Sequence, residues 1–265
     1  MPPGLPDPLP PGTTTLYGVD FTSAPRPAKG IVVAGATAAA PGEPVCVHSL
    51  QRLDSFEAFE RWLCMPGPWV GAFDLPFGLP RELMADWEWC SPTCADPSAE
   101  SGWPAIIGRF EALERAPMVD RLRAFCAPRP VGGKFAHRRS DGPAGSSPSM
   151  KWVNPPVAQM MHAGAPRLLR AGLHLPAVGV AGDPARVALE GYPGLVARTL
   201  IGRASYKTDD RRRQTAERGE QRARIIDALE HGAAEPHRPA PSGLARFTLE
   251  DRLVFDPAVR QRCLD

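Results

Sequence analysis

The chain has 265 residues, a mass of 28.6 kDa and a formal net charge of +2, with 43% hydrophobic and 23% charged residues. This length suits one large domain or one domain with an insertion, and the composition excludes wholesale disorder. Apolar runs fall short of the roughly 20 residues that cross a bilayer, and the start of the chain lacks a secretory signal pattern. Six cysteines without regular spacing do not make a disulfide scaffold. We therefore expect a cytoplasmic protein with no membrane partner.

The first half of the chain reads mainly as β-structure. A Pro/Gly-rich flexible lead is predicted over 1–13, and a single domain over 14–265. Short connections predict an antiparallel meander of three strands at 15–20, 30–34 and 45–50. Asp54 has the capping-box spacing to Glu57 and is predicted to begin a helix that ends at Pro66. A fourth strand is predicted at 69–74.

The middle of the chain, from about 80 to 180, is predicted to be an insertion of helices and a loop. Apolar spacing and prolines predict helices at 80–89, 104–115, 117–127 and 155–170. Residues 128–150 carry no periodicity and are predicted to form a long flexible loop. A short edge strand is predicted at 178–180. The order of elements thus predicts a mixed α/β fold.

The last part returns to one strand and then to helices. A fifth main strand is predicted at 185–190, and a helix follows it to about 201. Further helices are predicted at 208–231 and 244–255. The chain stops at Asp265 without a convincing final helix.

Three acids share one position in this pattern. Asp20, Asp74 and Glu190 are each the first charged residue at the end of an apolar strand. Ligands of open α/β sheets bind outside the carboxyl ends of parallel strands, and carboxylates there suit Mg²⁺ or Mn²⁺. Such ions can activate a water and stabilise the leaving oxygen of a phosphodiester. An acid after a strand also serves as a turn or capping residue, so the hypothesis depends on all three meeting.

Several stretches resemble the DUF429 family, a predicted nuclease group with the RNase H-like fold. The resemblance runs from about 14 to 230 and is carried by YGVDFTSA, GAFDLPFGLP, EGYP, KWVNPPVAQMM and SYK. It implies a five-stranded sheet in the order 3-2-1-4-5, with strands 1, 4 and 5 as parallel neighbours. It further implies that Asp20, Asp74 and Glu190 are metal ligands and catalytic residues. The family fold usually adds an acid from a C-terminal helix; here Asp265 is its candidate, or the chain is truncated there.

Basic residues provide candidate contacts to phosphate groups. Lys151, Lys207, Arg211 and Arg212 are the predicted substrate-binding residues, and a nucleic acid is the predicted partner. The segment around Arg138 is a candidate to fold over a substrate. The alternative for these cations is a solvated surface.

Two further classes of function remain open beside a Mg²⁺- or Mn²⁺-dependent nuclease. One is a non-catalytic protein that binds a nucleic acid or a nucleotide on the same fold. The other is ATP-dependent phosphotransfer, although the chain lacks paired glycine-rich phosphate loops and a second duplicated domain. Nucleic-acid binding that does not depend on Mg²⁺ would favour the non-catalytic binding protein. A rise in melting temperature with nucleotide would favour ATP-dependent phosphotransfer.

Overall fold

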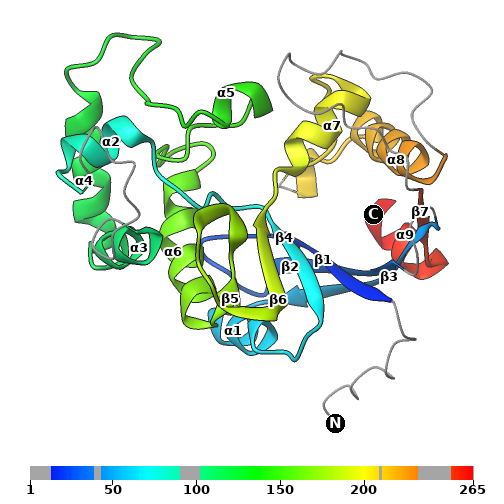
Figure 1. Cartoon of the computed structure of the whole chain (residues 1–265). Helices are drawn as coiled ribbons and strands as arrows, with labels where there is room; N and C mark the ends of the chain where they lie inside the picture. Colours follow the sequence, from blue (N-terminus) through cyan, green and yellow to red (C-terminus); the bar gives the residue numbers. More distant parts are fainter. Residues whose placement is uncertain (1–12, 39–42, 90–101, 209–210, 232–251, 265) are drawn as a thin grey trace.

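The centre of the molecule is a mixed β-sheet (Figure 1). The computed structural model describes residues 13–38, 43–89, 102–208, 211–231 and 252–264. Its strands are β1 (Thr14–Asp20), β2 (Ile31–Ala38), β3 (Val45–Leu53), β4 (Trp69–Phe73), β5 (Leu173–His174), β6 (Asp183–Glu190) and β7 (Leu253–Phe255). They lie in the order β5-β6-β4-β1-β2-β3-β7. The predicted α/β class is therefore confirmed.

The pairing of the strands determines which ends meet. β1 to β3 form the predicted antiparallel meander, whereas β4 pairs in parallel with both β1 and β6. The five strands predicted as the main sheet thus follow the order 3-2-1-4-5, with β6 as the fifth. The short strands β5 and β7 extend the two edges in parallel with their neighbours. The carboxyl ends of β1, β4 and β6 consequently lie at one edge of the sheet.

Helices cover both sides of the sheet. They are α1 (Phe56–Leu63), α2 (Arg81–Asp86), α3 (Trp103–Glu111), α4 (Arg115–Cys126), α5 (Asp141–Ala144), α6 (Val157–Arg170), α7 (Pro193–Ile201), α8 (Ala216–His231) and α9 (Pro257–Leu264), with 3₁₀ turns η1 (Pro176–Val178) and η2 (Arg211–Arg213). Figure 1 shows α2, α3 and α4 grouped on one side and α7, α8 and α9 on the other. The helices α2 to α6 form the predicted insertion between β4 and β6. No helix in the described part of the chain is long and apolar enough to cross a membrane.

The first helix begins one residue later than its sequence predicts. Ser55, not Asp54, is the N-cap, because its backbone is extended and its hydroxyl accepts a hydrogen bond from the Ala58 amide at 3.2 Å. The helix then buries Phe59 and Trp62 completely or nearly so. Their rings stack at 6.1 Å. Ser and Asp are comparable caps, so composition alone does not separate the two positions.

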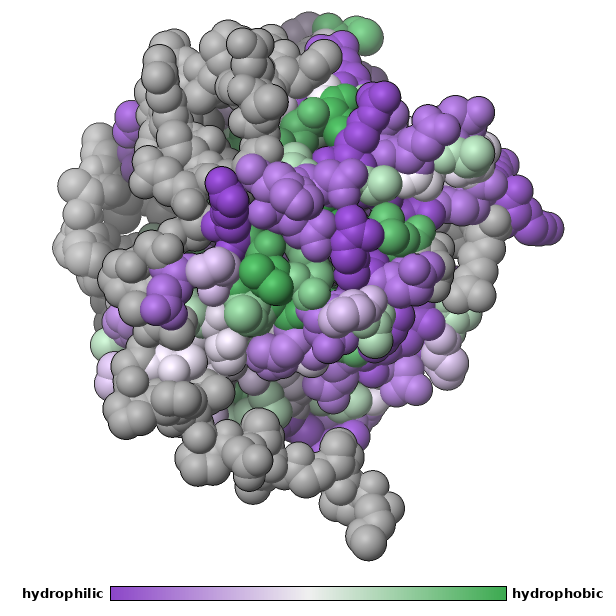
Figure 2. All heavy atoms as spheres, turned by 90° about the vertical axis from the view of Figure 1, so that its right-hand side faces the viewer, coloured by the Kyte–Doolittle hydropathy of each residue, from purple (hydrophilic) through white to green (hydrophobic). Residues whose placement is uncertain are grey.

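The main core lies on the sheet face that α1 and α6 cover, and it continues to α3, which packs against α6. Val19, Phe73 and Ala188 point from β1, β4 and β6 into it. A smaller cluster of Ala36, Val47 and Val259 joins the other face to α9. Figure 2 shows the side that carries α8 and α9 as mainly hydrophilic, with a group of hydrophobic residues near its middle. The sheet is therefore packed more deeply on the α1 face.

Three predicted segments differ from the structure, and one observed helix was not predicted. The edge strand is Leu173–His174, not 178–180, because a 3₁₀ turn occupies Pro176–Val178 and Gly179 ends it with a φ of 70°. The charged helix begins at Ala216, after η2. Leu253–Phe255, within the predicted helix 244–255, is a strand that pairs with β3; residues 232–251 lie outside the described part. The final helix α9 was not predicted.

The segment 128–150 contains fixed, buried positions rather than a loop without structure. Asp141, Ser149 and Met150 are at most 1% exposed, and α5 lies within the segment. Residues 1–12 of the predicted lead 1–13 and the candidate fourth acid Asp265 lie outside the described residues.

Candidate functional site

Asp20 and Asp74 stand at the ends of the neighbouring parallel strands β1 and β4. Val19 pairs with Phe73 in the register, and the Asp74 amide donates to the Val19 carbonyl at 2.8 Å. The two acids therefore occupy equivalent positions on adjacent strands, which lie about 4.8 Å apart in a sheet. Side chains in such positions point to the same face of the sheet. The structure thus brings two of the three predicted acids together.

The residues that follow these acids anchor the pair to the core. Phe21 and Leu75 are buried and contact α6 at Gly164. A Cβ at position 164 would lie 2.7 Å from Leu75 Cδ2 and 3.1 Å from Phe21 Cζ. The absence of a side chain at Gly164 lets α6 pack directly against both strand ends.

The environment of Asp74 makes its ionised form unfavourable. Burial, and then the negative charge of Asp20, raise the pKa of Asp74 from 3.8 to about 6. Lys207 acts in the opposite direction, and its Nζ lies 3.9 Å from Asp20 Oδ1. A strongly perturbed acid beside a charged partner in a cleft is typical of functional sites.

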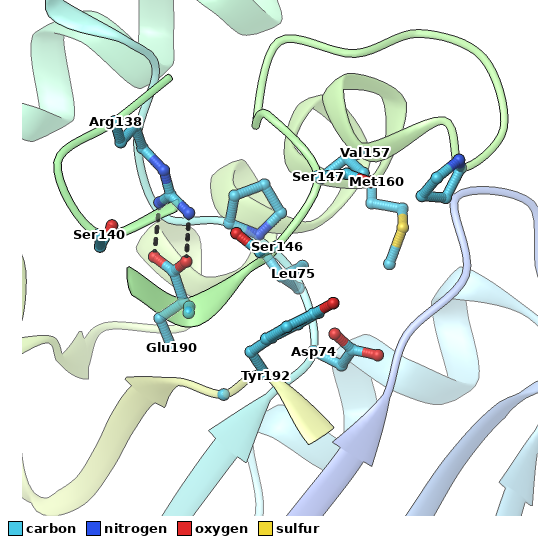
Figure 3. Close-up of a pocket in the computed structure, with 14 residues that line it drawn as sticks. Asp74, Leu75, Arg138, Ser140, Ser146, Ser147, Val157, Met160, Glu190 and Tyr192 are labelled. Carbon is cyan, nitrogen blue, oxygen red and sulfur yellow. Dashed lines mark hydrogen bonds and ion pairs between the residues drawn. The ribbon is translucent and has the colours of Figure 1, made fainter. Parts of the chain in front are cut away.

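Glu190 ends β6 but does not join this pair. It pairs in register with Phe73, one residue before Asp74, and successive side chains of a strand point to opposite faces. Its carboxylate accepts hydrogen bonds from Arg138 at 2.6 and 2.8 Å and from the Phe77 amide at 2.9 Å. In Figure 3, Glu190 points towards Arg138 and away from Asp74.

Arg138 is held between two carboxylates. Besides Glu190, it contacts Asp141 through Nε at 3.0 Å and Nη2 at 2.8 Å. The side chain of Asp141 is fully buried and that of Arg138 is 16% exposed. Burial lowers the pKa of the Arg138 guanidinium, but the hydrogen bonds and charges of Glu190 and Asp141 outweigh burial and leave the pKa raised. This contact fixes the 138–147 segment to the end of β6.

A cavity of about 190 Å³ opens beside Asp74, at the carboxyl ends of β4 and β6 (Figure 3). The turn after β4, the 138–147 segment, the start of α6 and the turn after β6 form its walls. The described lining residues are Asp74, Leu75, Pro76, Arg138, Ser140, Ala144, Ser146, Ser147, Pro155, Val157, Met160, Glu190, Gly191 and Tyr192. The predicted acids Asp74 and Glu190 therefore share one cavity without contacting the same group.

Tyr192 forms an aromatic wall of this cavity. Its ring lies between the Glu190–Arg138 pair and Asp74 in Figure 3. Arg198 of α7 donates to its hydroxyl and to the carbonyl of Gly145. Burial, as the largest cause, raises the pKa of Tyr192. The tyrosine is thus held in place as a neutral ring.

The predicted cationic residues are distributed differently. Lys207 lies at the Asp20–Asp74 pair. Lys151 donates from Nζ to the Asn154 carbonyl at 2.6 Å, in the segment that leads into α6. Arg211 belongs to η2, and Arg212, in the same turn, is exposed.

The donor chemistry of the pair fits a divalent cation. Mg²⁺ usually binds one or two protein carboxylates and completes its octahedron with waters and substrate phosphates. Asp20 and Asp74 supply two carboxylates on one face, and the exposed side of Asp20 leaves room for other ligands. Among the residues that the structure describes, no group of three or more His, Cys, Asp or Glu side chains could hold a metal ion. The predicted convergence is therefore seen for Asp20 and Asp74 alone.

Comparisons with known proteins add nothing to this geometry: no family model, no curated protein and no solved structure matches the chain. Sequence reasoning missed the cavity and the pairing of Arg138 with Glu190. Tyr192 belongs to the EGYP motif, which the sequence analysis did single out. The cavity walls come from four distant segments, so a signal for them could arise only from contacts between those segments.

Proposed function

We propose that this protein is a divalent-metal-dependent nuclease of the RNase H-like type that hydrolyses phosphodiester bonds at the Asp20–Asp74 pair. One observation carries the proposal: two carboxylates end adjacent parallel strands, and the second has its pKa raised to about 6. The strand order and the resemblance to the DUF429 family support the RNase H-like assignment. Mg²⁺ or Mn²⁺ is the proposed cofactor.

The residues at the site would contribute to the reaction in different ways. Asp20 and Asp74 would hold the ion, which would supply Lewis-acid polarisation of a phosphoryl oxygen and activation of a water when bound. Lys207, beside Asp20, contributes positive charge where a phosphate approaches. Glu190 holds Arg138 and thereby positions the cavity wall. Burial of Asp74 keeps its carboxylate fixed, so that it does not reorganise when the ion binds.

Metal binding is the first test. Isothermal titration calorimetry with Mn²⁺ is expected to detect binding to the wild-type protein and a loss of at least tenfold in affinity for Asp20→Asn and Asp74→Asn. Asp54→Asn is the matched control, because Asp54 is an exposed acid that follows β3, and β2 separates that strand from β1. Equal Mn²⁺ affinity in all four proteins would refute the metal site.

Cleavage is the second test. Labelled single-stranded DNA, single-stranded RNA, duplex and hybrid substrates are incubated with Mn²⁺ and with either the wild type or Asp20→Asn. Cleavage of at least one substrate by the wild type alone is expected. If both proteins are inactive but bind nucleic acid equally well with and without Mn²⁺, the alternative function of a non-catalytic nucleic-acid-binding protein is favoured.

A further inference from the structure

The cavity beside Asp74 has the size of a single ring. An apolar protein cavity of about 150 Å³ accommodates benzene, whereas pockets for drug-sized ligands measure roughly 300–1,000 Å³. The volume here is about 190 Å³. A six-membered ring with small substituents fits this volume, and a larger fused ring system fills it less well.

The charges at the cavity disfavour an anionic occupant. Arg138 is the cation among the described lining residues, and its guanidinium is engaged by Asp141 and Glu190. Two carboxylates against one guanidinium leave a negative balance, and Asp74 adds to it when ionised. A phosphate group would meet repulsion here, so the occupant is expected to be neutral.

The remaining lining combines flat apolar surface with polar atoms at the edges. Tyr192 offers a ring, and Leu75, Val157 and Met160 offer aliphatic surface. The hydroxyl groups of three serines and the carboxylate oxygens of the acids provide hydrogen-bonding partners. A planar heterocycle with donors and acceptors on its rim matches both features, since flipped bases are bound by stacking between apolar side chains and by hydrogen bonds to their edges.

We propose that this cavity receives one unstacked pyrimidine base of a nucleic-acid strand, with the neighbouring phosphate at Asp20 and Asp74. Asp74 lines the cavity and belongs to the acid pair, so a base seated here carries its own backbone to the proposed site of cleavage. A base within a duplex cannot enter without unpairing. The substrate class is therefore single-stranded nucleic acid. This inference rests on the proposed nuclease function and names its substrate.

The cavity can be blocked without touching the acids. Val157→Phe places a ring inside it, and Val153→Phe is the matched control, because Val153 is 48% exposed and is not among the lining residues. Fluorescence anisotropy measures the affinity for short oligothymidylate in the presence of Ca²⁺, a hard cation that offsets the charge of the acid pair where the neighbouring phosphate is proposed to lie. Base–aromatic stacking contributes about 1–3 kcal/mol per base, so Val157→Phe is expected to weaken binding by roughly 5- to 150-fold. Val153→Phe is expected to bind like the wild type.

Two further variants test the aromatic wall and protect against a misfolded Val157→Phe. Tyr192→Leu is expected to weaken binding by a similar factor, whereas Tyr192→Phe keeps the ring and is expected to retain most of the affinity. Circular dichroism establishes that each variant is folded. Unchanged oligonucleotide affinity in both folded Val157→Phe and Tyr192→Leu would overturn the proposal.

The oligonucleotides themselves separate the possible sources of the base. An oligonucleotide with one abasic position is expected to bind the wild type more weakly when that position is the one that would enter the cavity. In Val157→Phe the same abasic position is expected to cause no further loss of affinity. Oligothymidylate is expected to bind better than oligoadenylate, and a duplex to bind worst. Stronger binding of oligoadenylate, or competition by free CMP as effective as that of the oligonucleotide, would overturn the assignment to a pyrimidine in a strand.

The failure of this inference is distinguishable from failure of the nuclease function. If the cavity variants bind and cleave normally while Asp20→Asn is inactive, the base site is refuted and the nuclease function stands. If the cavity variants lose oligonucleotide affinity while Asp20→Asn cleaves like the wild type, the catalytic assignment fails and the base site remains.

Discussion

Replacing Asp74 with asparagine is expected to stabilise the protein at neutral pH when divalent ions are absent. A rise of the Asp74 pKa from 3.8 to about 6 corresponds to about 3 kcal/mol, because each pKa unit is equivalent to about 1.4 kcal/mol. Above pH 6 this carboxylate is ionised in the folded and unfolded chains alike, and the folded state bears the full cost. Below about pH 3 the carboxyl is protonated in both the folded and the unfolded chain, and the cost disappears.

The sign of the pH dependence follows from the raised pKa. As the pH rises from about 4 to 6, the unfolded chain loses the Asp74 proton first, so the contribution of this group to the free energy of unfolding falls. Asparagine does not titrate. The Asp74→Asn variant should therefore exceed the wild type in free energy of unfolding by up to about 3 kcal/mol above pH 6 and by only about 0.5 kcal/mol at pH 4.

Urea denaturation at several pH values between 4 and 8, in the presence of EDTA, measures this difference directly. A stability gain that is the same at pH 4 and pH 7.5 would show that the effect has another origin than ionisation. A wild type that is more stable than the variant at pH 7.5 would contradict the unfavourable burial of the charge.

Three other changes test the surroundings of the pair. Asp20→Asn should lower the pKa of Asp74, followed by NMR titration, yet leave it above 3.8 because burial is the larger cause. Arg138→Met should destabilise the fold by about 3–5 kcal/mol in urea denaturation, because it leaves Glu190 and a buried acid uncompensated. Gly164→Ala should lower the melting temperature through overpacking that costs about 1–3 kcal/mol, since its Cβ meets neighbours at 2.7 and 3.1 Å.

Matched variants define the baseline for these changes. Arg139→Met removes an exposed arginine next to Arg138 and should change stability by less than about 0.5 kcal/mol. Gly108→Ala lies in α3 with nothing within 4 Å of the added Cβ, so it should stabilise by roughly 0.5–1 kcal/mol. Equal changes in stability for Arg138→Met and Arg139→Met would contradict the charge argument. Equal changes for Gly164→Ala and Gly108→Ala would contradict the packing argument. An unchanged Asp74 pKa in Asp20→Asn would show that the two acids do not interact.

The strand ends were predictable because they depend on local pattern. Apolar runs that end in an acid located β1, β4 and β6, and short turns indicated the meander of β1 to β3. These two features place Asp20 and Asp74 at strand ends, and the parallel pairing of β1 with β4 was predicted only from the resemblance to the DUF429 family. Capping chemistry predicted α1 to within one residue, because Asp54 and Ser55 are both good caps.

The rest depends on contacts between distant segments, which local pattern does not contain. Whether Glu190 faces Asp74 is decided by a register offset of one residue, and the sequence of β6 does not specify its register. The segment 128–150 lacks periodicity because its order comes from Arg138 bonding to Glu190, far along the chain. The edge strand β7 pairs with β3 across most of the sequence.

The shared guanidinium of Arg138 has a consequence for how this protein can diverge. If one member of the Arg138, Asp141 and Glu190 group is lost, a charge that is largely shielded from water loses its partner. Replacement of a whole buried ionic group by apolar residues of similar size is, in contrast, often tolerated or even stabilising. Single substitutions in this group are therefore destabilising, whereas the simultaneous replacement of all three residues is not. Relatives of this chain should carry either the whole ionic group or a wholly apolar equivalent, with few mixed sets between them.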